Sequence, residues 1–93
     1  MNHLRAYKKI SNWRLITVEE FGIKYLEGIV NSQKIRSEKL ESFNFTRRIA
    51  KDYFNQYELG SIDESFAKEL EENGILFSDL DFESGKKSST SRK

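Results

Sequence analysis

Cysteine and proline are absent from this 93-residue chain, and glycine and histidine are scarce, with five and one. Without cysteine there is no disulfide framework and no thiolate zinc site, so the chain folds by packing alone or with a partner's help. No apolar run approaches the roughly 20 residues of a membrane span, and the amino terminus lacks a signal-peptide core. We therefore expect a cytoplasmic protein that makes no membrane contact.

The apolar content is unusually aromatic, with seven Phe, four Tyr and one Trp in 11.0 kDa. A chain of this length forms one small domain. Such a domain buries little more than about 60% of the surface that its unfolded chain exposes, which leaves apolar surface for a partner or a second copy to cover. Aromatic side chains are also the usual anchors of protein interfaces.

A formal net charge of +1 conceals strong segregation of charge along the chain. Residues 1–14 and 85–93 contain bases and no acids, whereas residues 61–83 contain eight acids and only Lys68 as a base. Residues 85–93 also lack any large apolar side chain that could offset the entropy of ordering. We expect one helical domain over residues 1–84 and a disordered basic tail over residues 85–93.

The spacing of apolar residues predicts an all-α fold, a small bundle of three main helices. The first helix begins at Thr17, whose hydroxyl forms a capping box with Glu20, and its apolar stripe runs from Val18 to Val30. Gly22 lies on this stripe, so we expect a neighbouring element to approach closely there. Residues 3–16 are compatible with either a short helix or a strand.

The second helix is expected to begin at Asn44 or Thr46 and to end near Leu59, before Gly60. The third is expected to begin with a capping box at Ser61 and to end at Gly74. Beyond it, an acidic and apolar strip is predicted to form a short extended segment or a final turn laid over the core. If the strip does not simply close the core, it is the first candidate for binding a partner protein, together with two tyrosines of the second helix. These candidate partner-binding residues are Phe77, Asp79, Leu80, Asp81, Phe82, Tyr53 and Tyr57.

Residues that could perform chemistry are almost absent. The sole histidine, His3, lies at the chain end, and there is no glycine-rich phosphate loop. Asp79, Asp81 and Glu83 alternate as metal ligands sometimes do, but the glycine and distant glutamate of a calcium loop are missing. We therefore expect no catalytic residue, no metal site, no cofactor and no enzymatic activity.

Two basic clusters support an alternative function in nucleic-acid binding. Lysine and arginine neutralise phosphates, and the neighbouring Tyr7 and Trp13 are of the type that stacks on bases. The acidic segment at residues 61–83 would oppose a polyanion unless it faced away. The candidate nucleic-acid-binding residues are Arg5, Lys8, Lys9, Arg14, Arg47, Arg48 and Lys51.

Residues 18–27, which read Val-Glu-Glu-Phe-Gly-Ile-Lys-Tyr-Leu-Glu, resemble a stretch of the small late-transcription coactivators of T-even-type phages. The tetrapeptide Asp79-Leu80-Asp81-Phe82 is similar to the acidic-hydrophobic motif of that family, although here a basic tail follows it. The resemblance implies docking on the host RNA polymerase flap and, through that motif, on the phage sliding clamp. The favoured hypothesis is a small non-enzymatic regulator that binds a larger protein complex in transcription or defence.

Overall fold

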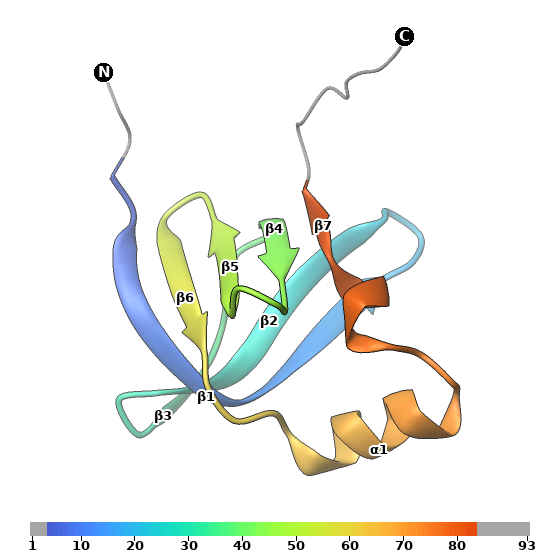
Figure 1. The fold of residues 1–93 in the computed structure, drawn as a ribbon. Coiled ribbons are helices and arrows are strands. Elements are labelled where there is room, and N and C mark those ends of the chain that lie inside the picture. Colours follow the sequence, from blue (N-terminus) through green and yellow to red (C-terminus); the bar gives the residue numbers. More distant parts are fainter. Residues whose placement is uncertain (1–3, 84–93) are drawn as a thin grey trace, which may run out of the picture.

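The computed structural model describes residues 4–83 and shows, over this range, a curled β-sheet with a single α-helix (Figure 1). The predicted all-α bundle of three helices is therefore wrong. The elements are β1 (Ala6–Val18), β2 (Ile23–Val30), β3 (Gln33–Arg36), β4 (Leu40–Asn44), β5 (Ile49–Asp52), β6 (Asn55–Leu59), α1 (Glu64–Glu72), the short 3-10 helix η1 (Phe77–Leu80) and β7 (Phe82–Glu83). Residues 85–93, expected to form a tail, lie outside the described range.

The strands form a mixed sheet in the order β3-β2-β1-β6-β5-β4-β7. The long strand β1 joins the two parts of the sheet. Its first half pairs in parallel with β6, and its second half pairs antiparallel with β2. As Figure 1 shows, β1 bends between these halves, and α1 lies beneath one end of the curled sheet. Residues 3–16, left open between helix and strand, thus contribute the longest strand over their described part.

The bend in β1 depends on close backbone approach at one glycine. Asn12 adopts a left-handed conformation with φ 52°, and the register with β2 shifts between Ser11 and Arg14. A Cβ atom on Gly28 would lie 2.8 Å from both the Ile10 side chain and the Ser11 carbonyl oxygen. The glycine that admits a close neighbour is therefore Gly28 and not Gly22, whose φ of +64° instead suits the β1–β2 turn, in open space.

The first predicted helix is in fact the end of β1, a turn and β2. In β2 the buried residues are Leu26, Gly28 and Val30, the period of two that marks a strand with one face inward. Isoleucine and valine also favour a pleated, half-buried strand over a helix. The apolar stripe combined residues from both strand faces, and this produced a false helical spacing.

The second predicted helix is the β5–β6 hairpin with the turn before it. Asn44, expected as a helix cap, accepts the backbone N–H of Arg47 at 3.0 Å, and Arg48 then turns the chain with φ 61°. An asparagine side chain starts a tight turn by the same hydrogen bond with which it caps a helix. Within the hairpin, Tyr57 and Leu59 alternate inward as in a strand.

The third predicted helix is present as α1. Its cap is Asp63 rather than Ser61: the Asp63 carboxylate accepts the backbone N–H of Phe66 at 3.0 Å. This bond and one from the Ser65 hydroxyl stabilise the charged form and lower the Asp63 pKa. Gly74, with φ +68°, ends the helix as expected.

One buried cluster holds the sheet and the helix together. Trp13 is fully buried, and its ring contacts Phe43 of β4, Phe45 of the following turn and Phe66 of α1 at centroid distances of 5.5, 6.3 and 6.2 Å. Leu70 adds a second contact from the helix. The helix is therefore docked on the core and is not a free appendage.

Candidate binding surfaces

The predicted partner-binding strip is engaged with the rest of the domain. The Phe77 ring stacks on Phe45 with centroids 4.4 Å apart, and the Asp81 carboxylate accepts the Phe45 backbone N–H at 2.8 Å. Leu80 and Phe82 pack against the buried core. This part of the chain closes the core, one of the two roles considered for it, and offers few side chains to a partner.

The two candidate tyrosines lie in different environments. Tyr53 is exposed in the β5–β6 turn, and its ring meets Phe54 edge-on. Tyr57 is 2% exposed, and its hydroxyl donates to the Asp52 carboxylate at 3.3 Å. Tyr57 therefore offers no surface to a partner and belongs to the core.

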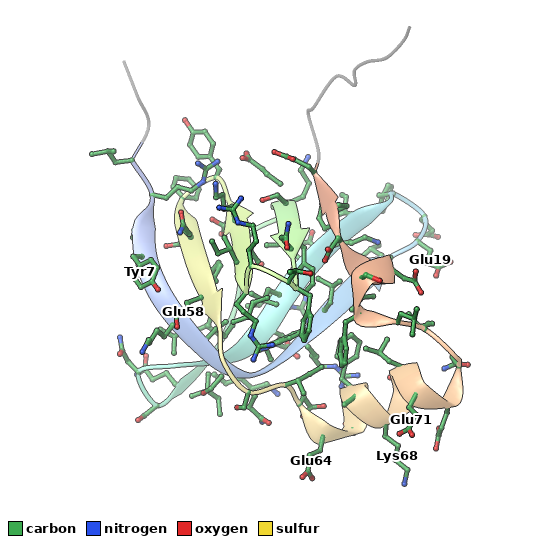
Figure 2. All side chains as sticks on the ribbon, viewed as in Figure 1. Tyr7, Glu19, Glu58, Glu64, Lys68 and Glu71 are labelled. Atoms are coloured by element: carbon green, nitrogen blue, oxygen red, sulfur yellow. The ribbon has the colours of Figure 1, made fainter. Side chains whose placement is uncertain are left out.

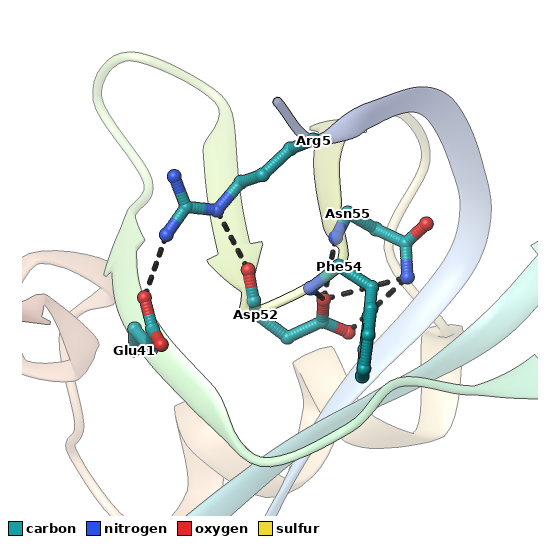
Figure 3. A network of polar contacts seen from close by, with 5 residues as sticks. All are labelled: Arg5, Glu41, Asp52, Phe54 and Asn55. Carbon is teal, nitrogen blue, oxygen red and sulfur yellow. Dashed lines mark hydrogen bonds and ion pairs between the residues drawn. The ribbon is translucent and has the colours of Figure 1, made fainter. Parts of the chain in front are cut away.

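Asp52, a residue that the sequence did not single out, is the buried polar centre of this end of the sheet. Its carboxylate accepts the backbone N–H groups of Glu38, Phe54 and Asn55 at 2.9, 2.8 and 2.6 Å. It thereby ties the β5–β6 turn to the segment before β4, as Figure 3 shows in part. The Asp52 side chain is fully buried, and its carboxylate is engaged by these backbone donors.

Burial, together with the charge and hydrogen bond of Asp52, raises the Tyr57 pKa above its ordinary value of 10.0. A raised folded-state pKa stabilises the domain below the unfolded pKa, and this stabilisation is lost as pH rises. We expect the free energy of unfolding, measured by urea titration, to fall above about pH 10 and to fall less steeply in Tyr57→Phe. An equally steep fall in Tyr57→Phe, with Tyr53→Phe as the exposed control, would contradict this assignment.

Three of the seven candidate nucleic-acid-binding residues are held by internal partners. Arg5 donates to the Asp52 backbone carbonyl at 2.7 Å and pairs with Glu41 at 2.6 Å (Figure 3). Arg14 pairs with Glu69 at 3.4 Å and lies over the Phe66 ring. The third, Arg48, lies over the Phe45 ring.

The other four bases form two groups, Lys8 and Lys9 on β1, and Arg47 and Lys51 at β5 and the turn before it. Lys9 on β1 lies opposite Glu58 on β6 in the strand register. The Glu58 carboxylate accepts a hydrogen bond from the hydroxyl of Tyr7 (Figure 2). This hydrogen bond raises the Tyr7 pKa. Lys8 lies opposite the buried Tyr57. Lys51 on β5 and Arg47 in the turn before it line one open cavity, together with Glu83. Of the seven candidate bases, the structure therefore brings Arg47 and Lys51 together.

An open apolar groove lies where α1 gives way to η1, with a volume of about 450 Å³. We call it the α1–η1 groove. Its lining residues are Ala67, Leu70, Glu71, Gly74, Ile75, Leu76 and Phe77. Leu76 is 66% exposed and Ile75 is 39% exposed, although both are large apolar residues. The sequence signal for this exposed apolar surface was a pair of adjacent apolar residues just after the glycine that ends the helix. Neighbours in an extended segment point in opposite directions, so both cannot face the core.

Backbone hydrogen bonds hold the groove in shape. The N–H of Ile75 donates to the Leu70 carbonyl at 2.9 Å, and that of Leu76 donates to the Asp79 carboxylate at 2.9 Å. The exposed apolar side chains are thus presented from a fixed backbone, which lowers the entropy cost of binding.

Within residues 4–83 no three histidine, cysteine, aspartate or glutamate side chains gather where they could hold a metal ion. No helix in this range has the length and apolar character to cross a bilayer. Searches for similar proteins found no matching family model, no matching curated protein and no matching solved structure.

Proposed function

We propose that this chain is a non-enzymatic regulator that binds a larger protein through the α1–η1 groove. The occupant is a segment of the partner that presents one large apolar side chain flanked by lysine or arginine. The observation that carries the proposal is the exposure of Leu76, 66%, over a preformed apolar groove. An apolar anchor that fills such a groove provides much of the binding energy in protein interfaces.

Charge around the groove supports a basic occupant. Residues 63–81 contain seven acids and only Lys68 as a base. Glu71 lines the groove itself, and Figure 2 shows Glu64 and Lys68 projecting from α1 away from the sheet. A negative field of this kind steers a positive partner toward the site and rejects acidic competitors.

The basic residues of this chain's own carboxyl end do not supply the occupant. Residues 85–93 contain Lys86, Lys87, Arg92 and Lys93, but they contain no large apolar side chain that could fill the groove. A partner protein that has both a large apolar side chain and flanking basic residues fits the α1–η1 groove better. We also propose a cytoplasmic location, because no apolar run in this sequence is long enough for a membrane span. The likeness to phage late-transcription coactivators is compatible with a polymerase-associated partner and stays a hypothesis.

The test uses the full chain, labelled with ¹⁵N, and two synthetic peptides with one central leucine. In one peptide lysines flank the leucine, and in the other glutamates do. We expect the lysine peptide to shift the backbone resonances of Leu70, Glu71, Ile75 and Leu76, and to bind more weakly at high salt. Leu76→Ser should weaken this binding about tenfold.

Leu4→Ser is the matched control, because Leu4 is also an exposed leucine, at 86%, and lies outside the groove lining. The control should leave peptide binding unchanged. Equal binding of the glutamate peptide, or shifts centred on residues away from α1 and η1, would refute the proposal.

A further inference from the structure

A second cavity opens where the curled sheet does not close. The short strand β3 pairs only with Glu27–Val30, so the first half of β2 faces β4 without strand pairing. The cavity between them, which we call the β2–β4 pocket, has a volume of about 450 Å³. Its side chains come from Phe21, Ile23, Lys24, Lys39, Leu40 and Phe82.

The pocket is cationic. Lys24 and Lys39 both line it, and no carboxylate does, although Glu19 and Glu20 precede Phe21 in the adjoining turn. Neither lysine forms an ion pair with another residue in the described range. Two unpaired ammonium groups at one concave site favour an anionic ligand.

The same pocket has two aromatic walls. Phe21 is 71% exposed, yet its backbone N–H donates to the Val18 carbonyl at 3.1 Å, which fixes the tip of the turn. The Phe82 ring lies 5.7 Å from the Lys24 ammonium. The exposed Phe21 ring is free to stack on a planar ring of a ligand, and the Lys24 ammonium beside Phe82 lies in the same pocket.

The pocket takes a compact ligand and not an added strand. Cα atoms of β2 and β4 approach within 8 Å of one another. A strand inserted between two others would need them about 9.5 Å apart, twice the ordinary spacing. A volume of about 450 Å³ is instead within the range of small-molecule sites.

From these observations we infer that the β2–β4 pocket binds a phosphate ester that carries a planar ring, and that this ligand is a nucleotide. Lys24 and Lys39 contact the phosphate, and the Phe21 ring stacks on the base. A free mononucleotide and a nucleotide within a single strand share this chemistry. The inference is independent of the α1–η1 groove, with which the pocket shares no lining residue.

The experiment titrates the full ¹⁵N-labelled chain with adenosine monophosphate, uridine monophosphate, adenosine and ribose 5-phosphate. We expect saturable shifts at Gly22, Lys24 and Lys39 with the nucleoside monophosphates, and much weaker binding of adenosine and of ribose 5-phosphate. No saturable shift up to about 1 mM ligand would overturn the inference. Binding of ribose 5-phosphate as tight as that of the nucleoside monophosphates would do the same, because the base would then contribute nothing.

Variants test the two parts of the site separately. Lys24→Gln and Lys39→Gln keep most of each side chain without its charge and should weaken monophosphate binding and its dependence on salt. Phe21→Ala should weaken nucleoside monophosphate binding at least about fivefold, because the stacking on the base is lost. Lys34→Gln, an exposed lysine on β3, is the matched control and should bind as the unchanged chain does.

A single-stranded oligonucleotide and O-phosphotyrosine distinguish the sources of the ligand. Binding of the oligonucleotide with the same dependence on Phe21 and Lys24 would identify a nucleotide within a strand, and preference for the mononucleotide would identify the free form. Tighter binding of O-phosphotyrosine than of either would overturn the assignment to nucleotides.

Discussion

Replacement of Asp52 by alanine is expected to lower the free energy of unfolding by about 3–5 kcal/mol, a large part of the stability of a small domain. The Asp52 carboxylate is completely buried and accepts three backbone N–H groups. Alanine would leave these three donors, and the buried Tyr57 hydroxyl, without their partner. A buried polar group without a hydrogen-bond partner destabilises a protein by more than a formed hydrogen bond stabilises it. The loss in free energy of unfolding therefore exceeds the loss expected on removal of an exposed carboxylate.

Urea unfolding followed by circular dichroism measures this loss. The stability of Asp52→Asn should lie between that of the unchanged chain and that of Asp52→Ala. An amide oxygen can still accept hydrogen bonds, whereas the NH₂ group of the amide would face backbone donors. Glu72→Ala, which removes an exposed carboxylate from α1, is the control and should change stability by no more than about 0.5 kcal/mol. An Asp52→Ala variant as stable as this control would show that the network around Asp52 does not hold the hairpin.

The helix α1 could be predicted because its determinants are local. Phe66 and Leu70 are four residues apart on one face, and Gly74 terminates the helix within the same short segment. The sequence predicts Ser61 as the cap, whereas the structure has Asp63. This difference moves the start of the helix by two positions and leaves the buried face of the helix unchanged. Tertiary contacts confirm such a pattern but are not needed to establish it.

The sheet could not be predicted in the same way, because its determinants are far apart in the sequence. Ala6–Ile10 pairs with Asn55–Leu59, and no short window contains both strands. Between residues 18 and 30 the apolar residues are dense enough to match both helical and strand periods. The β-branched residues favour strands there, whereas the spacing alone favours a helix.

The surroundings of the candidate residues could not be predicted for a related reason. Composition identified the residues of the strip at positions 77–82 but not their contacts, so Asp81 looked free although it accepts the Phe45 N–H. Nothing in the sequence next to Asp52 indicates that its carboxylate is buried. Only the folded arrangement shows that Leu76 and Phe21 are exposed and that Tyr57 is not.

Trp13 links the sheet to the helix, and its replacement by alanine should cost about 3–5 kcal/mol. The side chain is fully buried, and its indole N–H donates to the Gly60 carbonyl at 3.1 Å. Its backbone also joins the start of α1: its N–H donates to the Ser61 carbonyl, and its carbonyl accepts the Asp63 N–H. Alanine keeps these backbone bonds but leaves a cavity beneath Phe66, so α1 loses its main contact with the sheet.

Thermal unfolding followed by far-ultraviolet circular dichroism tests this, because the variant has no tryptophan left for fluorescence. Phe21→Ala removes an aromatic side chain that is 71% exposed and should leave stability within about 0.5 kcal/mol. Trp13→Phe should fall between the two variants, since it keeps a ring in the core and loses the hydrogen bond to Gly60. If Trp13→Ala unfolded at the same temperature as Phe21→Ala, α1 and its groove would not depend on this contact. A loss confined to Trp13→Ala and Trp13→Phe would instead show that the core contacts of Trp13 stabilise the fold that carries α1.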